Sequence, residues 1–501
     1  MHDHHEEHPP HPPTESAPPT EDQKAGLGYW AARVLEEADK ASQDFAADPV
    51  HDLRVAIRRC RSMADGFLSV DPDPAWRQMK KLGKGLFASL GDLRDTQVMM
   101  EWVEKLSTKD DPLRQILLDS LRKKEAELKL AAKQAVDGFD RKRWTALNDR
   151  LVERATRVPL EGPVFQYLAI ERWHEAYELH RTALRNRSAI SYHQLRIGIK
   201  RFRYTVENFL PKRHKRWSRD LRELQDALGE VHDFDVLWGM VKSHPEVGAA
   251  ERQLWQQTLT SERQKRLNLY RKKMLGRHSL WHQWRAELPQ GDELAEAALE
   301  NMRTWAAFLD PDNKHSRLVT TLALEIYDAL VRDEVLAESD LSRRILEAAA
   351  VMHDVGRSKN AGHRKRGYRM IRKLKTPVGF GEEYLQSVAI VAHYHRGGLP
   401  PSNHPIFAGL PAQRRGELMP LAGVLRLANA LDETHDQRIS SIELKRRDGA
   451  LTLYAQGMTH SISAFGEQLA RARYLLEICV KMPILIKPLP ARRKTPSQPA
   501  N

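Results

Sequence analysis

VHDLRVAIRRCR at residues 50–61 returns, with the same spacing of charges, as YHQLRIGIKRFR at residues 192–203. At the period of a helix, the first stretch places its basic side chains on one face and Leu53, Ile57 and Cys60 on the opposite face. The second stretch repeats this arrangement. The residues expected on the two basic faces are His51, Arg54, Arg58 and Arg61, and then His193, Arg196, Lys200 and Arg203. Each of the two helices has a cation at every turn of one face. This repeated pattern predicts a surface that binds a long, negatively charged molecule.

The repeat extends beyond these helices. MKKLGKGLFASLGDLRDTQVM at 79–99 has its counterpart in SRDLRELQDALGEVHDFDVLW at 218–238. Four further cations occupy matching positions in the two segments, namely Lys81 and Lys84 in the first and Arg219 and Arg222 in the second. We therefore expect an internally duplicated helical domain, with two bundles facing each other across a cationic groove.

These repeated elements resemble a known family. The two H-x-x-R-x-x-x-[RK]-x-x-R helices, each followed by an L-G-[DE]-x-x-[DH] segment, look like the CHAD domain, the conserved-histidine α-helical domain, over about residues 22–285. The resemblance implies an all-α fold of two four-helix bundles whose central basic surface binds inorganic polyphosphate. Composition alone indicates only a polyanion.

Length, charge and cysteine content set wider limits. A chain of 501 residues should contain two or three domains. The formal net charge of +13 is uneven, because residues 191–222 carry ten Lys or Arg against two acids. Cys60 and Cys479 are the only cysteines, so no disulfide framework is indicated and a reducing cytoplasm is expected. No apolar run of about 18 residues occurs, so we expect no transmembrane helix.

The strongest catalytic signal is AAAVMHDVGR at residues 348–357. His353 and Asp354 follow an apolar helix directly, while His315 lies near the start of an earlier helix and Asp432 ends a later one. Their order, H...HD...D, is similar to that of the HD phosphohydrolase superfamily. Imidazoles and carboxylates together suit a divalent ion that activates water for attack on phosphorus. The other interpretation is a degenerate HD fold with buried, hydrogen-bonded histidines.

A second metal site is a further expectation. Asp354 would bridge the two ions, and the candidates for the additional ligands are His363, His393 and His395. The ion itself is expected to be Mn, Mg or Fe.

A closer resemblance lies within that superfamily. AAVMHDVGRSKNAGHRKRGYRMI (349–371), VAHYHRGG (391–398) and VLRLANALDETHDQRI (424–439) look like the C-terminal region of exopolyphosphatases and guanosine pentaphosphate phosphatases, over about residues 292–489. In that family this region helps bind polyphosphate, and catalysis is assigned to an actin-like ATPase-type domain that this sequence does not contain. Two interpretations follow: the region here only binds, or its own His-Asp pair hydrolyses.

Basic residues surround this site. Residues 351–375 contain nine Lys or Arg and one acid, Asp354. We assign Arg357 and Arg396 a catalytic role beside Asp354, and we assign substrate binding to Arg364, Lys365 and Arg366, because guanidinium groups clamp phosphate oxygens. A solvated basic helix is the simpler explanation, but it does not account for arginines adjacent to both site motifs.

The expected fold is mainly α: a duplicated four-helix-bundle CHAD-like domain, then an α-helical HD domain with a small α+β C-terminal element. A hairpin turning at Asp448-Gly449 within 440–456, a helix at 466–480 and a strand at 482–487 make up that last element. The predicted boundaries are a disordered His- and Pro-rich tail (1–23), the CHAD-like domain (24–285), a linker (286–291), the HD domain (292–435), the α+β subdomain (436–489) and a disordered tail (490–501).

Together these features predict a cytoplasmic, metal-dependent phosphohydrolase of inorganic polyphosphate, associated with polyphosphate granules, in which the CHAD-like half binds the polymer and the HD half cuts it. A homodimer is the expected assembly, with no membrane partner. One alternative is a non-catalytic polyphosphate binder, and another is an HD hydrolase of a nucleotide such as guanosine penta- or tetraphosphate. Nucleic acid is not expected, since the basic helices lack interleaved aromatic residues and show no standard binding motif.

Overall fold

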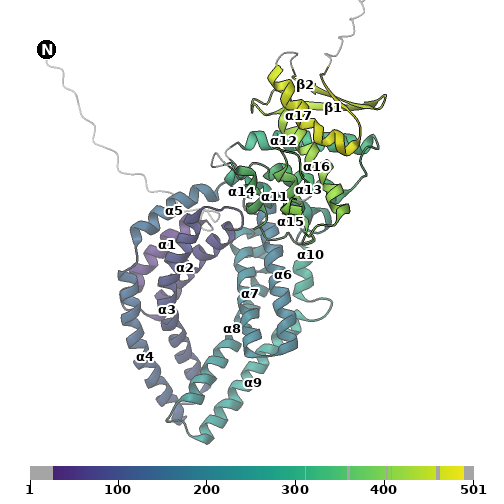
Figure 1. Ribbon diagram of the computed structural model, residues 1–501. Coiled ribbons are helices and arrows are strands. Elements are labelled where there is room, and N and C mark those ends of the chain that lie inside the picture. Colours follow the sequence, from purple (N-terminus) through teal and green to yellow (C-terminus); the bar gives the residue numbers. More distant parts are fainter. Residues whose placement is uncertain are drawn as a thin grey trace, which may run out of the picture. The chain divides into compact units, whose positions relative to one another are not determined.

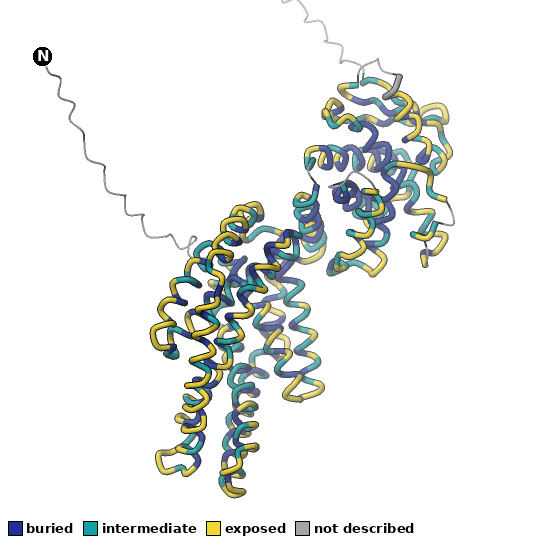
Figure 2. Tube along the Cα trace, turned by 60° about the vertical axis from the view of Figure 1, so that its left-hand side comes forward, coloured by how far each residue is buried: buried dark blue, intermediate teal, exposed yellow. Residues whose placement is uncertain are grey.

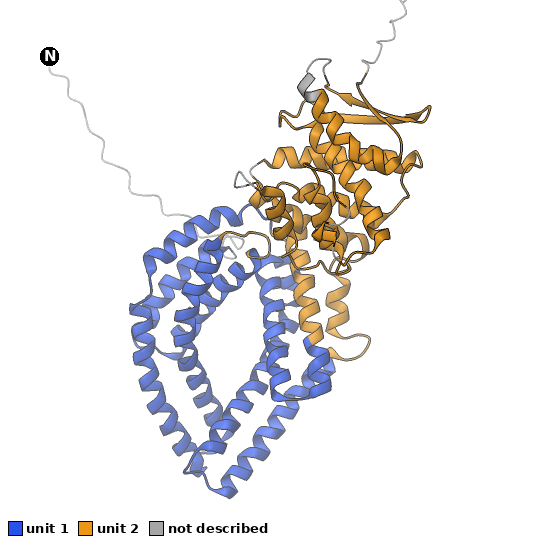
Figure 3. Ribbon diagram, in the orientation of Figure 1, with its two compact units in different colours: residues 1–67, 74–159, 179–273 blue, residues 68–73, 160–178, 274–501 orange. Residues whose placement is uncertain are grey.

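The computed structural model describes residues 26–310, 312–357, 362–401, 404–407, 409–458 and 463–489, without the side chains of 463–465. The predicted tails, 1–23 and 490–501, lie outside these ranges. The described chain is mainly helical and has a small sheet near its C-terminal end, which confirms the predicted fold class. It divides into two compact units (Figure 3). Unit 1 comprises residues 1–67, 74–159 and 179–273, and unit 2 comprises residues 68–73, 160–178 and 274–501.

Unit 1 is built from two copies of one helical pattern. Its helices are α1 (Leu27–Ala41), α2 (Ala47–Phe67), α3 (Pro74–Leu106), α4 (Pro112–Asp137), α5 (Arg141–Ala155), the end of α6 (Pro163–Asn186), α7 (Ala189–Phe209), α8 (Pro211–Ser243) and α9 (Ala249–Met274). Helices α2 and α7 each have 21 residues, α3 and α8 each have 33, and α4 and α9 each have 26. The duplication expected from the sequence is therefore present in the fold in these three pairs of helices.

The two copies meet along α2 and α7, the helices that carry the repeated basic faces. Arg59 of α2 donates a 2.9 Å hydrogen bond to Asn208 Oδ1 of α7 and pairs with the Glu207 carboxylate. Asn208 in turn donates to Ser62 Oγ at 3.1 Å. Because these partners are largely buried, they fix the relative position of the two helices.

The copies share a second contact at the far ends of their long helices. Trp102 of α3 packs against Phe234 of α8 with ring centroids 4.7 Å apart, within a core that α4 and α9 complete. Figure 1 shows α3 and α4 converging on α8 and α9 at the lower end of unit 1. In both units, the buried positions lie on the inner faces of the helices (Figure 2).

Unit 2 is a helical domain around an apolar core. Its helices are the first part of α6, α10 (Leu280–Ala286), α11 (Gly291–Leu309), α12 (Asn313–Arg332), α13 (Asp340–Met352), α14 (His363–Ile371), α15 (Tyr384–His393), the short η2 (Pro405–Phe407), α16 (Ala412–Leu431) and α17 (Ser463–Val480). Every residue of α16 from Leu421 to Leu431 is buried, as expected for a helix that is covered on all sides. Gly423 lets α17 approach closely, since a Cβ there would lie 2.9 Å from Leu476 Cα.

A three-stranded sheet completes unit 2. Strands β1 (Ser441–Arg447) and β2 (Ala450–Gln456) form an antiparallel hairpin, and β3 (Ile484–Pro488) pairs parallel to β2. Asp448 and Gly449 both have positive φ, as the predicted two-residue turn requires. The predicted hairpin, helix and strand are all present, although α17 starts three residues earlier than expected. No helix in the described ranges is long and apolar enough to cross a bilayer.

Candidate polyanion surface and metal centre

The repeated helices of unit 1 form a basic surface, which we define by Arg54, Arg58, Arg61, Arg196, Lys200 and Arg203. All six are partly buried. Among the described residues, no carboxylate oxygen lies within 4.0 Å of Arg54, Arg58, Arg196 or Lys200, whereas Arg203 Nε is 3.7 Å from Glu207 Oε2. A cationic face on which most cations lack an ion-pair partner is suited to an external anion.

Charges from both copies act on one lysine of this surface. Burial has the largest effect on the pKa of Lys200, and the charges of Arg196 in its own copy and of Arg58 and Arg54 in the other copy lower it too. The Asp233 carboxylate opposes them, and the net pKa is about 7. The two basic faces therefore lie close enough to repel each other, as expected if they line one binding surface.

Aromatic side chains hold two of these arginines in place. The Arg54 guanidinium lies 4.3 Å from the centroid of Phe87 and donates to the Phe87 carbonyl at 3.0 Å, and Arg58 lies 5.1 Å from the centroid of Tyr204. Sequence analysis missed both aromatic residues, because Phe87 belongs to the following helix and Tyr204 to the other copy.

The remaining predicted residues of unit 1 differ in exposure. His193 is partly buried and its Nδ1 is 3.3 Å from Nδ1 of His232, which was not predicted. His51 and the four cations of the second repeated segment, Lys81, Lys84, Arg219 and Arg222, are exposed. Asp233 was also not predicted; burial raises its pKa to about 6 although Arg196 lowers it.

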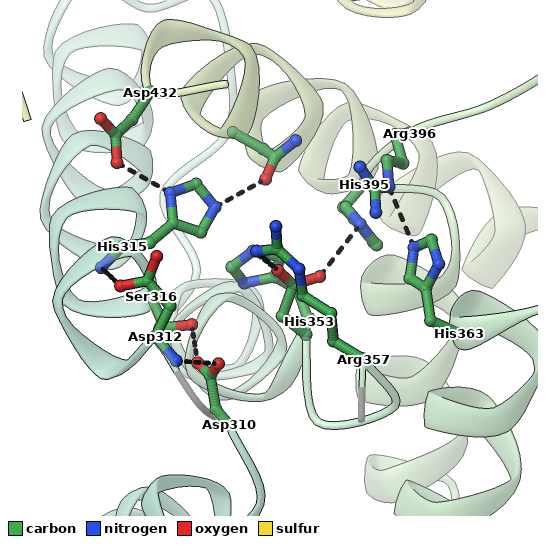
Figure 4. A network of polar contacts seen from close by, with 12 residues as sticks. Asp310, Asp312, His315, Ser316, His353, Arg357, His363, His395, Arg396 and Asp432 are labelled. Atoms are coloured by element: carbon green, nitrogen blue, oxygen red, sulfur yellow. Dashed lines mark hydrogen bonds and ion pairs between the residues drawn. The ribbon is translucent and has the colours of Figure 1, made fainter. Parts of the chain in front are cut away.

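In unit 2, the predicted site residues lie at or next to the ends of five helices, and Figure 4 shows several of them. His315 lies in the first turn of α12, where the capping carboxylate of Asp312 accepts a hydrogen bond from the His315 amide. His353 caps α13 and Asp354 follows it. The other predicted residues are His363, which begins α14; His393, which ends α15; His395, two residues later; and Asp432, which caps α16.

Two of the histidines have a fixed tautomer. Nδ1 of His353 bonds the Ala350 carbonyl at 2.7 Å, and Nδ1 of His395 bonds the Ala392 carbonyl at 2.7 Å. A carbonyl only accepts, so each Nδ1 carries the proton and each Nε2 keeps its lone pair. Both Nε2 atoms are buried without a hydrogen-bond partner among the described atoms, as is Asp354 Oδ1.

These unpartnered atoms face one another. His353 Nε2 lies 3.8 Å from Asp354 Oδ2, and His395 Nε2 lies 3.7 Å from Asp354 Oδ1. Two groups have ligand atoms that all lie within 4.8 Å of one another: His315, His353 and Asp354, and then Asp354, His363 and His395. Asp354 belongs to both. Such groups could hold a divalent metal ion, and the buried lone pairs fit one, since they otherwise have no donor.

Arginines balance the shared carboxylate. Burial raises the pKa of Asp354, but His353, His395, Arg357 and Arg396 lower it, and the net pKa is well below its ordinary value. Arg357 Nη1 donates to Asp354 Oδ2 at 3.1 Å, and Arg396 Nε donates to His363 Nε2 at 2.9 Å. Asp354 is thus ionised, with both predicted catalytic arginines beside it.

The observed groups differ from the predicted ligand set at two residues. Asp432 Oδ2 accepts a 2.7 Å bond from His315 Nδ1, and its Oδ1 accepts from the Gln437 amide, so Asp432 orients His315 and is in neither group. His393 is also in neither group. Burial lowers its pKa, and its ring packs near Tyr394 and His404.

Several residues of the site were not predicted. Asn429 Oδ1 lies 3.2 Å from His315 Nε2, one helical turn before Asp432 on α16. Asp312 Oδ2 bonds His435 Nδ1 at 2.7 Å, and His435 Nε2 is 3.1 Å from Arg357 Nη1. The helical spacing of Asn429 and Asp432 was a usable signal, whereas the approach of His435 to Arg357 depends on how two loops fold.

The three predicted substrate residues of α14 have different environments. Lys365 is exposed. Arg364 Nη1 donates to the Arg396 carbonyl at 2.8 Å, and Arg366 Nη1 donates to the Gly356 carbonyl at 2.5 Å. Arg366 therefore supports the backbone next to Arg357, and Arg364 supports the loop after His395.

Comparison with known families and structures assigns both units. Residues 28–242 match the CHAD domain, and residues 300–459 match Ppx/GppA phosphatase, domain III. A CHAD domain and a Ppx/GppA domain III are found in one chain. The crystal structure of the CHAD domain from the plant Ricinus communis is 23% identical, with a TM-score of 0.40, over 49% of this chain and 88% of that one. Comparison with curated proteins finds no match.

The two matched segments contain the two sites described above. The basic surface lies in the CHAD segment, and the groups around Asp354 lie in the domain III segment. This combination suggests a phosphatase related to polyphosphate or to nucleotides.

Proposed function

We propose that the chain is a metal-dependent phosphohydrolase of inorganic polyphosphate, in which the CHAD segment binds the polymer and the domain III segment, acting as an HD-type site, hydrolyses its phosphoanhydride bonds. The observation that carries this proposal is the arrangement of His353, His395 and Asp354: two buried imidazole lone pairs converge on one ionised carboxylate. A binding protein without a reaction to catalyse gains no stability from three unpartnered buried atoms.

Each residue has a role in this mechanism. His315, His353 and Asp354 would hold one divalent ion, and Asp354, His363 and His395 a second. A bound ion would supply Lewis-acid activation of water and neutralise phosphate charge. Arg357 and Arg396, each about a third exposed, would contact phosphate oxygens and stabilise the charge that moves to the leaving chain. Asp432 holds His315 in orientation, and the Ala350 and Ala392 carbonyls do the same for His353 and His395.

The assay that tests this proposal uses the full chain with long-chain polyphosphate, with guanosine pentaphosphate and with each of Mn²⁺ and Mg²⁺. We expect phosphate release from polyphosphate that requires the divalent ion and stops on chelation. Polyphosphate that is bound but never shortened would favour a binding protein. Cleavage of the nucleotide alone would favour a nucleotide hydrolase.

Binding to the CHAD segment is expected to tighten as the pH falls from about 8.5 to about 6.5, by up to about tenfold. Burial lowers the pKa of Lys200 to about 7, so its amine is largely neutral at the upper pH. A polyanion favours the charged form of the Lys200 amine. At a pH above the pKa of Lys200 in the unbound protein, binding of the polyanion is therefore coupled to uptake of a proton by this amine. The measurement is the Kd for polyphosphate at both pH values with chelator present.

The matched variant is Lys200→Arg, which keeps its charge throughout this range. Its Kd should change much less with pH. Equal pH dependence in the two proteins would show that Lys200 does not titrate at the binding surface.

A further inference from the structure

Two arginines from different helices hold the loop that follows His395. Arg364 of α14 donates from Nη1 to the Arg396 carbonyl at 2.8 Å, and Arg426 of α16 donates from Nη1 to the Gly398 carbonyl at 3.3 Å. Gly397 has a φ of +92°, and a Cβ there would lie 2.2 Å from Arg364 Nη1. The guanidinium of Arg364 thus lies directly against the loop, in space that only glycine leaves open.

Arg426 is a buried cation without a counter-charge. Arg426 is 7% exposed. In the described ranges, no carboxylate oxygen lies within 4.0 Å of Arg426 or Arg364. The undescribed stretches nearest in sequence, 358–361 and 402–403, contain no Asp or Glu. Burial lowers the pKa of Arg426, and the charge of Arg364 lowers it further. A buried guanidinium is costly unless an anion accompanies it.

An unpartnered hydroxyl lies in the same neighbourhood. Tyr394 is 3% exposed, and its hydroxyl has no hydrogen-bond partner among the described atoms. Burial raises the pKa of Tyr394, while the charge of Arg364 opposes that rise. Arg364 therefore acts electrostatically on both Arg426 and Tyr394. Within the part of the chain that the structure describes, the hydroxyl is an unused donor.

We propose that Arg364, Arg426 and the Tyr394 hydroxyl form a second phosphate subsite, which binds the phosphoryl group next to the one that is cleaved. This inference rests on the proposed function and adds two residues, Arg426 and Tyr394, to the binding site. Two guanidinium groups and one hydroxyl are complementary to a tetrahedral oxyanion. Arg396 connects this subsite to the metal-capable group, since its carbonyl accepts from Arg364 and its Nε donates to His363.

A simpler explanation is that the two arginines only clamp the loop. A guanidinium has five N–H donors, and each of these arginines uses one of them on a loop carbonyl. The clamp needs no contribution from the Tyr394 hydroxyl. Tyr394→Phe therefore separates the two explanations, because it removes the unused donor and leaves both clamping bonds intact.

The experiment titrates the full chain with orthophosphate, pyrophosphate and tripolyphosphate in the presence of chelator, which prevents turnover. Hydrogen exchange of peptides covering residues 393–401 reports on the loop itself. We expect orthophosphate to slow this exchange in the wild-type protein. Tyr394→Phe should raise the apparent Kd about tenfold, the usual effect of losing a hydrogen bond to a charged group, without changing exchange in the ligand-free protein. Arg426→Met should abolish the response.

Each outcome decides for or against the subsite. Protection that Tyr394→Phe weakens supports it, and a stronger response to pyrophosphate or tripolyphosphate than to orthophosphate identifies a chain phosphoryl group as the ligand. Equal protection by phosphate in the wild type and in Tyr394→Phe overturns it. It is also overturned if phosphate does not slow exchange in the wild type while the ligand-free Arg426→Met variant exchanges faster, since the arginines then only clamp the loop. If the subsite is wrong, metal-dependent hydrolysis can still be observed. If hydrolysis is not observed, phosphate can still slow the exchange of residues 393–401 in chelator. The two proposals can therefore be tested separately.

The variant Arg58→Ala/Lys200→Ala serves as the control for anion binding in the CHAD segment. It should leave the orthophosphate response of residues 393–401 unchanged. A lost response in this variant would place the bound phosphate in the CHAD segment and overturn the subsite.

Discussion

Asp354→Asn is expected to lower polyphosphate hydrolysis by about 10³-fold or more, because the substitution removes the one carboxylate that belongs to both metal-capable groups. The amide keeps the size of the side chain but cannot balance the charges of Arg357 and Arg396. Two measurements check this prediction: the initial rate of phosphate release, and the number of divalent ions bound per chain, which should fall as well.

The matched control is Asp328→Asn in the same unit. Asp328 forms an exposed pair with Arg343, at 2.9 and 3.0 Å, and such surface pairs contribute little to stability. This variant should keep its activity and its bound metal. Full hydrolysis by Asp354→Asn, with a metal content like that of the wild type, would place the reaction elsewhere in the chain.

Arg58→Ala/Lys200→Ala is expected to weaken polyphosphate binding by about 10²-fold, with each lost charge-assisted contact costing about tenfold. The two residues come from different copies, and among the described residues neither has a carboxylate oxygen within 4.0 Å. Binding should also depend less on salt, with a slope of log K against log salt that is smaller by about 1.4 for two contacts to a single-stranded polyanion. Fluorescence anisotropy with end-labelled polyphosphate, in chelator, measures both quantities.

Lys123→Ala/Lys124→Ala is the control with the same loss of charge. These lysines are exposed on α4, outside the basic surface. Their removal should reduce affinity only slightly through the net charge. If both double variants lose affinity equally, binding reflects total charge and not the repeated helices.

The features that could be predicted from the sequence are those that depend on residues close together in the chain. The helical period of residues 50–61 placed Leu53 and Ile57 in the core and the arginines on the other face, as observed. Asp448 and Gly449 defined the hairpin turn because few other residues adopt its left-handed backbone. The ligand atoms of His315, His353 and Asp354 lie close together, as their resemblance in order to a known superfamily led us to expect.

The rest depends on tertiary packing. Asp432 stays a predicted metal ligand. Its carboxylate accepts a hydrogen bond from His315 Nδ1, and no sequence pattern specifies such a contact. Arg426 is the one charged residue in the apolar stretch 418–431, and only the packing of α16 against the loop at 396–398 shows which carbonyl it contacts. Phe87 and Tyr204 support arginines that lie on other helices, so their role depends on contacts between distant segments.

The equal lengths of α2 and α7, of α3 and α8, and of α4 and α9 have a consequence for the polymer that the CHAD segment is proposed to bind. A linear chain of identical phosphates has no polarity, unlike a nucleic acid or a peptide. A binding surface made of two equivalent halves presents the same series of cations to such a chain whichever end arrives first. The polymer can therefore bind in either orientation, and a larger fraction of collisions leads to binding.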